Sequence, residues 1–406
     1  MRLSVALVSE HASPLATLGG VDAGGQNVYV AALARSLAAR GDAVTVYTRH
    51  DDRALPECVP FAPGVTVVHV PAGPVRHLDK DELWPWMDEF AAGLRRAFAD
   101  HAPDVVHSHF WMSGWAAQRA TTGATSIPWV HTFHALGTVK RRHQGDADTS
   151  PPDRIAVERD LAAGADRIVA TCADELGELI EMGADAGRVV IVPCGLDPAL
   201  FTPYGPIAPR RRGLRRLVTV SRLVPRKGIA DIVVALGELP DCELQVIGGP
   251  PEAQLQSDAE YRRLHALATD IGVVDRVSFR GGVAQPDVAA VLRSADVAVC
   301  APTYEPFGIS PIEAMACGTP VVGTACGGLL DTVVPGSTGV LVPPHDPSAI
   351  ARAVRQLLDH PTELQRLSTT AARSTRTRYA WNVVARQVEH VYHAVAEPSR
   401  LARRAS

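Results

Sequence analysis

The stretch Y-E-P-F-G-I-S-P-I-E-A-M-A-C-G, residues 304–318, has the pattern of a loop that leads into a short helix. Ser310 is a residue type that caps helices, Pro311 suits the first helical position, and Gly318 suits the position just past a helix end. A helix start here would leave the backbone N–H groups of residues 307–312 without intrahelical partners. Such groups favour an anion or a ring of sugar hydroxyls.

Two carboxylates, Glu305 and Glu313, flank this helix start, and both could accept hydrogen bonds from the vicinal hydroxyls of a sugar. The structural alternative is that Glu313, three residues after Ser310, only completes a capping box, while Glu305 is a solvated loop residue. The glycine-rich and basic segments described below favour the binding site over this alternative.

Length and composition predict an ordinary globular protein with two domains. The chain has 406 residues, of which 46% are hydrophobic and 21% charged, and its formal net charge is -4. Nothing in this charge balance calls for nucleic acid. The seven cysteines are scattered without metal-binding or C-x-x-C spacing, as in a reducing compartment. The start, MRLSVALVSEH, predicts a first strand rather than a signal peptide, and no apolar run reaches membrane-spanning length, so we expect a cytoplasmic protein without integral membrane contact.

Valine-rich apolar runs alternate with helical patterns in both halves of the chain. Examples are LSVALV at 3–8, DVVHSH at 104–109 and RLVTVS at 216–221. Continuous apolar strands separated by helices indicate parallel sheets covered on both faces, so we predict an α/β protein with two doubly wound, Rossmann-like domains facing a cleft. The predicted domains are 1–205 and 214–380, with a Pro- and Arg-rich linker near 203–214 and a C-terminal helix at about 381–406.

A glycine-rich loop, GGVDAGGQN at 19–27, follows the first predicted strand and opens the first helix. Glycines such as Gly24 and Gly25 allow a tight turn and close approach of the backbone, and a helix N-terminus favours a phosphate. The pattern departs from G-x-G-x-x-G, so taken alone it also fits a flexible connection between strand and helix.

A second loop, SRLVPRKG at 221–228, follows the first strand of the second half. Arg222 can hold a pyrophosphate with its planar fork, and Lys227 can do so as a point charge. An exposed basic loop is the structural alternative. The two carboxylates predicted in the same domain favour the phosphate site.

Histidines end two strands of the first half. His134 lies in the segment HTFHALG at 131–137, whereas His107 and His109 alternate along DVVHSH. A lone histidine is more often structural than a ligand, and no third ligand at zinc spacing accompanies this pair. The D-x-D sequence at 146–148 lies in a polar loop, and we interpret it as a chance match to a metal-binding motif.

Five segments in the order VSEHASPL, GGVDAGGQNVYV, HSHFWMSG, HTFHALGTVK and EPFGISPIEAMACGTPVV carry a family resemblance, to which SRLVPRKG adds. Over nearly its whole length the chain resembles the retaining GT-B glycosyltransferases of family 4, which include the inositol-phosphate N-acetylglucosaminyltransferases of the mycothiol pathway and the sucrose-phosphate synthases. The resemblance implies the GT-B fold, with the last helix returning to the first domain, and a nucleotide-diphosphate sugar as donor. It is more specific for the fold than for the substrates.

The resemblance also implies a donor site built from the second domain and the glycine-rich loop. The sugar would be held by Glu305, Phe307, Gly308 and Ile309, and the ribose by Glu313. The diphosphate would be held by Arg222, Lys227, Gly24 and Gly25. His134 would lie beside the donor sugar at the reaction centre. The catalytic residues implied in this way are His134, Arg222, Lys227 and Glu305.

The acceptor site departs from the family pattern. The resemblance places Asn27, Lys80 and Arg154 at the acceptor, but Phe110 and Ala135 stand where the inositol-phosphate enzymes have a Tyr and a Thr. Two hydroxyl donors to a phosphate are thereby lost, each worth on the order of 1–3 kcal/mol. We infer that inositol phosphate is not the natural acceptor, although Lys80 and Arg154 still suggest a polar, even anionic, one.

The sequence therefore predicts a retaining glycosyltransferase that moves a sugar from a nucleotide-diphosphate sugar, with UDP preferred over GDP or ADP, to a hydroxyl of a small polar acceptor. No metal is expected, because Arg222, Lys227 and helix amides would meet the charge of the diphosphate. Three alternatives stay open: transfer to inositol phosphate as in the mycothiol pathway, epimerisation or hydrolysis of a nucleotide sugar on the same fold, and non-catalytic binding of a nucleotide sugar. No nucleic-acid partner is expected, and a homodimer is left open.

Overall fold

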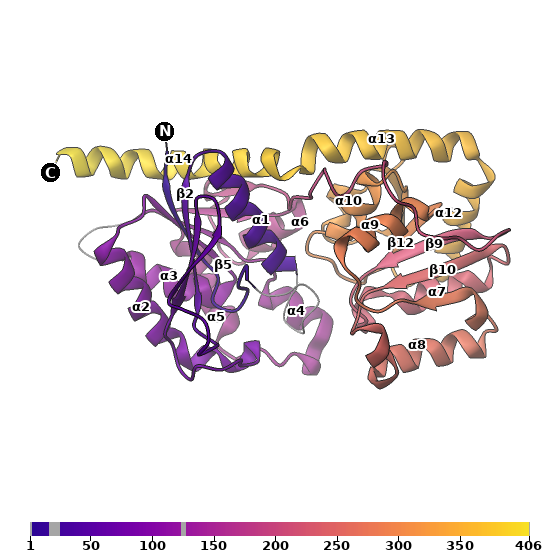
Figure 1. The fold of residues 1–406 in the computed structure, drawn as a ribbon, viewed down its shortest axis with the longest axis horizontal. Coiled ribbons are helices and arrows are strands. Elements are labelled where there is room, and N and C mark those ends of the chain that lie inside the picture. The colour runs from indigo at the N-terminus through magenta and orange to yellow at the C-terminus, as the bar shows by residue number, and fades with distance from the viewer. Residues whose placement is uncertain (1, 16–24, 123–126, 406) are drawn as a thin grey trace. The chain divides into compact units, whose positions relative to one another are not determined.

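The computed structural model describes residues 2–15, 25–122 and 127–405, with side chains up to 397. The described chain forms two compact units (Figure 1): residues 2–15, 25–122, 127–193 and 381–405 form the first, and residues 194–380 form the second. Each unit is a parallel sheet with helices on both faces, which confirms the predicted fold class. No helix in the described parts of the chain is long and apolar enough to cross a membrane.

The division between the units falls at Pro193 and Cys194, earlier than the predicted linker at 203–214. The intervening segment is tied to the second unit by backbone contacts. The Leu196 amide donates to the carbonyl of Tyr379 at 2.7 Å, and Arg293 donates to the carbonyls of residues 200, 202 and 206. Arginines of the predicted linker also bind carboxylates of this unit, as Arg211 does with Glu243 at 3.6 Å.

The first unit contains an eight-stranded sheet in the order β3-β4-β2-β1-β5-β6-β7-β8. All neighbouring strands are parallel except the edge pair β3 and β4, and β3 was not among the predicted strands. The order reverses between β1 and β5, so the crevice beyond the carboxyl ends of these two strands is the expected ligand position. The strands are β1 (Ser4–Val8), β2 (Ala43–Arg49), β3 (Cys58–Ala62), β4 (Val65–Val70), β5 (Val105–His109), β6 (Trp129–Thr132), β7 (Arg167–Ala170) and β8 (Val189–Ile191).

Helices cover both faces of this sheet (Figure 1). The α-helices are α1 (Gly25–Ala39), α2 (Met87–Asp100), α3 (Trp111–Thr121), α4 (Gly137–Gln144), α5 (Arg154–Gly164), α6 (Ala173–Glu181) and α14 (Trp381–Ala405). The short 3-10 helices are η1 (Lys80–Glu82), η2 (Trp84–Trp86), η3 (Gly145–Ala147) and η4 (Ala186–Arg188). Residues 80–100 form η1, η2 and α2 in succession, with Pro85 inside the second 3-10 turn. Leu83, Phe90 and Leu94 of this segment are fully buried and pack into the core.

The C-terminal helix α14 packs against α1 and the first sheet. Trp381 meets Tyr29 of α1 in an edge-to-face contact, with ring centroids 5.3 Å apart. The hydroxyl of Tyr392 lies 2.6 Å from Nδ1 of His107 on β5. Helix α14 is therefore part of the first unit although it follows the second in sequence.

The second unit contains a six-stranded parallel sheet in the order β11-β10-β9-β12-β13-β14. The order reverses between β9 and β12, so the expected ligand position lies beyond the carboxyl ends of those strands. The strands are β9 (Arg215–Val220), β10 (Cys242–Ile247), β11 (Val277–Phe279), β12 (Val297–Cys300), β13 (Val321–Thr324) and β14 (Gly339–Val342). The helices are α7 (Ile229–Gly237), α8 (Ala259–Asp270), α9 (Gln285–Ser294), α10 (Ile309–Ala316), α11 (Leu329–Thr332), α12 (Pro347–Asp359) and α13 (Pro361–Tyr379), with the 3-10 turns η5 (Pro225–Lys227), η6 (Glu252–Ser257) and η7 (Val274–Arg276).

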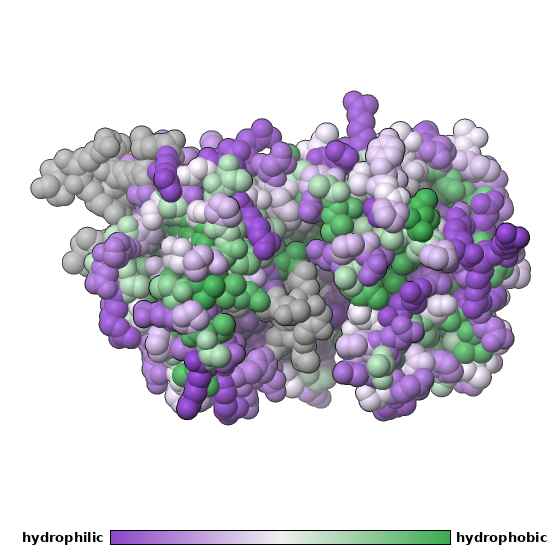
Figure 2. Space-filling view, viewed as in Figure 1, coloured by the Kyte–Doolittle hydropathy of each residue, from purple (hydrophilic) through white to green (hydrophobic). Residues whose placement is uncertain are grey.

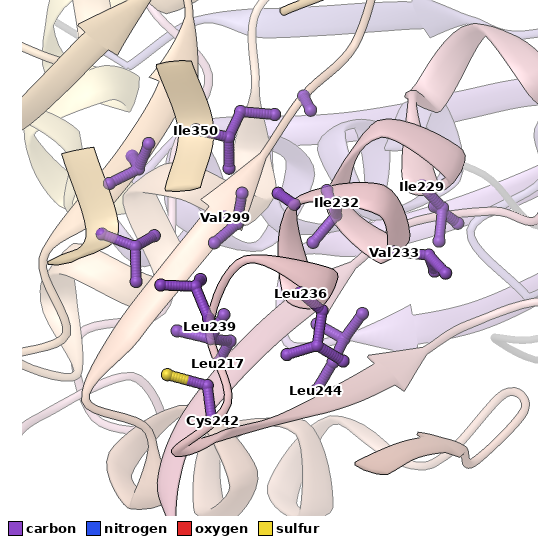
Figure 3. Close-up of a cluster of buried hydrophobic side chains, with 14 of the residues drawn as sticks. Leu217, Ile229, Ile232, Val233, Leu236, Leu239, Cys242, Leu244, Val299 and Ile350 are labelled. Atoms are coloured by element: carbon purple, nitrogen blue, oxygen red, sulfur yellow. The ribbon is translucent and has the colours of Figure 1, made fainter. Parts of the chain in front are cut away.

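Aliphatic side chains from α7 and the central strands form the core of the second unit (Figure 3). Ile232 and Leu236 of α7 pack with Leu217 of β9, Leu244 of β10 and Val299 of β12, and all five are at most 1% exposed. This core holds α7 close to the sheet and so fixes the loop between β9 and α7. The surface is more polar than this core. On the face drawn in Figure 2, small hydrophobic patches alternate with hydrophilic side chains.

Candidate functional site

The predicted donor residues of the second unit lie in the two loops at its strand-order reversal. Arg222 and Lys227 follow β9, and Glu305 follows β12. The Nζ of Lys227 and the carboxylate of Glu305 form a direct ion pair, and their side chains are 16% and 15% exposed. The two loops are also joined by their backbones, because the Thr303 amide donates to the carbonyl of Arg226 at 2.9 Å. The structure thus brings together two residues that the sequence assigned separately to the diphosphate and the sugar.

Arg222 stands beside this ion pair with an exposed side chain. Enclosure by the loop and the neighbouring Arg226 lower the pKa of Arg222 from its usual value, while the Glu305 carboxylate raises it. A guanidinium stays charged at neutral pH under any such shift. The loop after β9 therefore carries two cations: Arg222 lies at the surface, and Lys227 is paired with Glu305.

Glycines allow these loops to meet. Gly228 has a left-handed φ of 63°, and a Cβ there would lie 1.8 Å from the carbonyl oxygen of Ala301. Gly327 has a φ of 48°, and its Cβ would lie 2.2 Å from the carbonyl oxygen of Glu305. Side chains at these positions would push the β9 and β12 loops away from their neighbours, and the ion pair would be disturbed.

Helix α10 (Ile309–Ala316) begins two residues earlier than its sequence predicts. The N-cap is Gly308 with a left-handed φ of 91°, and the helix makes no side-chain cap hydrogen bond. The predictions of Ser310 as N-cap and of a capping box with Glu313 are therefore wrong, because Ser310 already lies inside the first turn. Gly318, with a φ of 82°, follows the C-cap Cys317, as predicted. Phe307, Gly308 and Ile309 still surround a helix N-terminus, where the first amides lack intrahelical partners.

Glu313 lies on α10, facing enclosed surroundings, although part of the residue remains exposed. Burial raises the pKa of Glu313 to about 8. The carboxyl is thus mostly protonated at neutral pH, and it can donate as well as accept a hydrogen bond.

In the first unit, the strand-order reversal places Phe110 at the carboxyl end of β5. Its backbone has φ 81° and ψ 154°, a conformation that only glycine adopts readily. Such strain costs on the order of 1–3 kcal/mol and is concentrated at binding and catalytic sites. The conformation is held by hydrogen bonds of the Phe110 amide to Thr132 and of the Gly114 amide to the Phe110 carbonyl, each 2.9 Å long.

Four of the five predicted acceptor residues meet at Phe110. Lys80 Nζ lies 5.6 Å and Arg154 Cζ 5.1 Å from the centroid of its ring, and Arg154 Nη2 donates to the Ala135 carbonyl at 2.7 Å. Asn27 is 4% exposed in α1 and donates to the Ser13 carbonyl at 3.1 Å. The cluster around Phe110 therefore consists of two cations, an aromatic ring and a backbone carbonyl.

The charge of Arg154 is already compensated. Its Nε donates to Glu158 at 2.7 Å within α5, and the two side chains are 3% and 0% exposed. The other oxygen of Glu158 accepts the Gly137 amide at 2.7 Å, and Nη1 of Arg154 donates to Ser150 at 3.2 Å. A buried carboxylate thus already pairs with Arg154, and the expectation that Arg154 also supplies positive charge to an anionic acceptor stays a prediction.

His134 follows β6 in a left-handed conformation, with φ 61°. Its Nε2 lies 3.0 Å from Nδ1 of His109, and its ring meets Tyr29 edge to face. Burial, with a smaller contribution from His11, lowers the pKa of His134 to about 3. The ring is neutral at physiological pH, so it can form hydrogen bonds with a substrate but does not bring a positive charge.

Two neighbouring histidines, His107 and His131, are held by contacts within the first unit. His107 lies between the Tyr392 hydroxyl and Thr132 Oγ1, at 2.6 and 2.8 Å, and His131 lies 2.8 Å from Ser108 Oγ. Burial lowers the pKa of His107 well below its usual value. These contacts join α14 to the sheet that carries His134.

Asp148, the second aspartate of D-x-D, is paired with basic neighbours. Asp148 accepts Lys140 at 2.8 Å and lies 3.7 Å from Arg141. Burial acts to raise the pKa of Asp148, but the Lys140 and Ser150 hydrogen bonds prevail and lower it. Within residues 2–15, 25–122 and 127–405, no group of three His, Cys, Asp or Glu side chains has the geometry to hold a metal ion.

One part of the predicted site lies outside the described residues, and another part of the site was not predicted from the sequence. Gly24 and the preceding glycines of the loop lie outside the described residues, and Gly25 is the first residue of α1. The sequence analysis also missed Glu10 and His11, which follow β1 at the strand-order reversal. Their side chains contact one another at 2.6 Å. Their position directly after the first strand, in VSEH, was the available signal.

Comparisons with known proteins agree with this architecture. Residues 24–195 match the model of the glycosyl transferase 4-like domain, and residues 208–374 match that of glycosyl transferases group 1. The D-inositol 3-phosphate glycosyltransferase of Thermomonospora curvata is 37% identical over 96% of this chain and 94% of its own length, and that of Streptomyces coelicolor is 38% identical over 98% and 92%.

Solved structures with the same fold span the whole chain. Sucrose-phosphate synthase from Thermosynechococcus elongatus is 32% identical, covers 100% of both chains and has a TM-score of 0.87. HepE from Anabaena, solved in complex with UDP-glucose, is 18% identical, covers 97% of this chain and 100% of its own, and has a TM-score of 0.73.

Proposed function

From the premise that this chain belongs to the GT-B glycosyltransferases of family 4, we propose that it is a retaining enzyme. It transfers a sugar from a nucleotide-diphosphate sugar, with UDP as the nucleotide, to a hydroxyl of a small polar acceptor. The observation that carries this proposal is the Lys227–Glu305 ion pair at the strand-order reversal of the second unit.

The ion pair supports donor binding because both partners are partly exposed. Each side chain can therefore give up its contact with the other and bind a group of the ligand instead. Solvent still reaches both side chains, so separating this pair costs less than separating a fully buried one. Lys227, with Arg222, then binds the diphosphate, while Glu305 accepts hydrogen bonds from sugar hydroxyls. The amides at the start of α10 add donors for the sugar. Glu313 binds the ribose.

The proposed reaction takes place on one face of the donor sugar. The bond from C1 to the phosphate oxygen breaks, and the acceptor oxygen bonds to C1 on the same side, while the departing phosphate takes the acceptor proton. Lys227 and Arg222 stabilise the negative charge that develops on the diphosphate. His134, which is neutral, forms hydrogen bonds with the donor sugar. With this charge compensation the reaction requires no metal ion.

A thermal-shift series tests the donor. UDP, GDP and ADP are added in turn, and a nucleotide at a hundred times its Kd raises the free energy of unfolding by about 2.7 kcal/mol. We expect the largest shift with UDP and a weaker one in Lys227→Ala. Arg212→Ala, which removes an exposed arginine that precedes β9 in the second unit, is the matched control. Equal shifts in all three proteins would exclude Lys227 from the nucleotide site.

Transfer to inositol phosphate is the second candidate. The relatives named D-inositol 3-phosphate glycosyltransferase favour it, and so does Lys80 beside Phe110. Phe110 and Ala135, which lack the hydroxyls of the family pattern, oppose it. Product analysis with and without inositol phosphate separates the two candidates. Product formation from donor alone would instead indicate an epimerase or a hydrolase, and binding without turnover would indicate a non-catalytic protein.

A further inference from the structure

The second aspartate of the D-x-D sequence is enclosed, although the first is not. The side chain of Asp148 is 2% exposed, whereas Asp146 is exposed in η3. One oxygen of Asp148 accepts Lys140 Nζ of α4 at 2.8 Å and the Ser150 amide at 3.0 Å. Although burial alone would raise the pKa of Asp148, the hydrogen bonds of Lys140 and Ser150 lower it, so this enclosed carboxylate is ionised at neutral pH.

The hydroxyl of Ser150 connects this aspartate to the start of α5. Ser150 is 8% exposed, and its Oγ accepts Lys140 Nζ at 2.8 Å and Arg154 Nη1 at 3.2 Å. Two positive charges thus share one oxygen. Glu158 pairs with Arg154 at 2.7 Å, and Asp148 pairs with Lys140. Because like charges shielded from water repel each other strongly, the ionised aspartate allows Lys140 and Arg154 to share this oxygen.

The residue between these two, Thr149, connects the same segment to η1. Its Oγ1 donates to Asp81 Oδ2 at 2.6 Å. Asp81 follows Lys80, whose Nζ lies 3.9 Å from the other oxygen of that carboxylate. Residues 148–150 therefore contact η1 on one side and the start of α5 on the other, and we call these three residues the 148–150 clip.

The two elements that the clip joins carry the two predicted acceptor cations. Lys80 Nζ and Arg154 Cζ lie 5.6 and 5.1 Å from the centroid of the Phe110 ring. Phe110 is fixed in a strained conformation at the end of β5. Lys80, in contrast, lies on a 3-10 helix of three residues, and its side chain is 32% exposed. So short a helix has few hydrogen bonds of its own, and the clip ties it to a buried ion pair.

We infer that Asp148 is a positioning residue of the acceptor site: through the clip it holds η1 and the start of α5 at a fixed separation and so keeps Lys80 and Arg154 on Phe110. It acts through these residues and not on the substrate. The second aspartate of D-x-D thus binds an ammonium group of the protein. The inference rests on the proposed function, because it assumes that an acceptor binds at Lys80 and Arg154.

Amide hydrogen exchange, followed by mass spectrometry of the full chain, tests the clip without a substrate. Asp148→Asn keeps the shape of the side chain and removes its charge, and Thr149→Val removes a hydroxyl from an exposed residue. In both variants we expect the amides of residues 79–86 to exchange at least fivefold faster, because local opening becomes easier. Asp146→Asn is the matched control and should exchange like the wild type. Wild-type exchange in Thr149→Val refutes the clip.

Thr149→Ser is the conservative variant that keeps the hydroxyl. It should restore the wild-type exchange of residues 79–86, because a serine hydroxyl can still donate to Asp81. Exchange as fast as in Thr149→Val would show that the methyl group matters rather than the hydrogen bond, and would contradict the inference.

Transfer kinetics test the link to the acceptor. UDP-glucose and UDP-N-acetylglucosamine are offered with myo-inositol, D-inositol 3-phosphate, glucose or glucose 6-phosphate, and products are measured by mass spectrometry. With the best acceptor of the wild type, Asp148→Asn should raise the acceptor KM at least fivefold, keep kcat within about twofold and leave the UDP-induced thermal shift unchanged. An unchanged acceptor KM in the folded variant overturns the inference and leaves Asp148 a merely structural role. For a wild type that uses none of these acceptors, the exchange experiment decides.

The two aspartates also separate this inference from a metal site. A divalent metal held by D-x-D requires both carboxylates, so Asp146→Asn and Asp148→Asn would then lose transfer together and Mn²⁺ would stimulate the wild type. That outcome overturns the inference. Failure of the proposed function itself looks different, since UDP would then neither shift the melting temperature of the wild type nor be released from either UDP sugar.

Discussion

The protonation of Glu313 should control nucleotide binding. Burial raises the pKa of this carboxyl to about 8, so it is mostly neutral at pH 7. If Glu313 binds both ribose hydroxyls, as proposed, it must accept two hydrogen bonds, and the ionised form does this best. UDP binding should then release a proton, and the affinity for UDP should therefore depend on pH.

The magnitude follows from the pKa. With a value of about 8, about nine-tenths of the protein carries the Glu313 proton at pH 7, and removing it costs about 1.4 kcal/mol. The affinity for UDP should therefore rise about tenfold between pH 7 and pH 9, and binding at pH 7 should release close to one proton. The free energy of unfolding should change in the opposite sense. The folded protein holds this proton more tightly than the unfolded chain, so the stabilisation that the Glu313 proton provides is lost as pH rises from about 4.5 through about 8.

Isothermal titration calorimetry with UDP measures the linkage. The titration is repeated at pH 7 in two buffers that differ in ionisation enthalpy, and then at pH 8 and 9. Glu313→Gln is the matched control, because it keeps the size of the side chain, removes its titration and leaves the titration of UDP itself unchanged. Equal proton release and equal pH dependence in the wild type and Glu313→Gln would refute the proposed role of Glu313.

Four further predictions follow from the site. Lys227→Ala or Arg222→Ala should lower kcat/KM at least a hundredfold, roughly 3 kcal/mol of transition-state stabilisation, in steady-state assays with a UDP sugar; near-wild-type turnover would remove the diphosphate clamp. Transfer should persist in EDTA, and complete loss that Mn²⁺ or Mg²⁺ restores would contradict the metal-free reaction. Phe110→Tyr with Ala135→Thr should improve transfer to inositol phosphate non-additively; efficient wild-type transfer to that acceptor would instead support the mycothiol-type candidate. Gly228→Ala should lower both the melting temperature and kcat, since its Cβ would lie 1.8 Å from the Ala301 carbonyl oxygen, and wild-type values of both would show that the loop relaxes without cost.

Both sheets were predictable because their strands are continuous apolar runs separated by helical patterns. The strand that escaped prediction, β3, is an edge strand with Pro60 inside it and with mostly half-exposed residues, so it lacks the buried run that identified the others. The start of α10 was misplaced for a local reason. Gly308 adopts the left-handed cap, and a Ser-Pro pair that resembles a cap then falls inside the first turn.

The site was predictable as a set of residues but not as a set of contacts. Lys227 and Glu305 were both selected, yet they are 78 positions apart, and only the fold shows that they pair. Glu10 was missed because its hydroxyl partner Ser113 is 103 positions away. The neutralisation of Arg154 did have a sequence signal, since Glu158 stands four residues later on the same helix, where such side chains meet.

The two ion pairs of the site explain why matching a motif does not identify a ligand-binding charge. The Lys227–Glu305 pair is 16% and 15% exposed, so water or a ligand can reach it when it separates. The Arg154–Glu158 pair is buried, and removing one partner from such a pair costs about 3–5 kcal/mol. A substrate phosphate would have to draw Arg154 away from a carboxylate that cannot reach water. Solvent reaches the carboxylate that pairs with Lys227 but not the one that pairs with Arg154. A ligand can therefore separate the Lys227 pair more readily than the Arg154 pair, and this difference depends on the exposure of the partner rather than on the match to the family pattern.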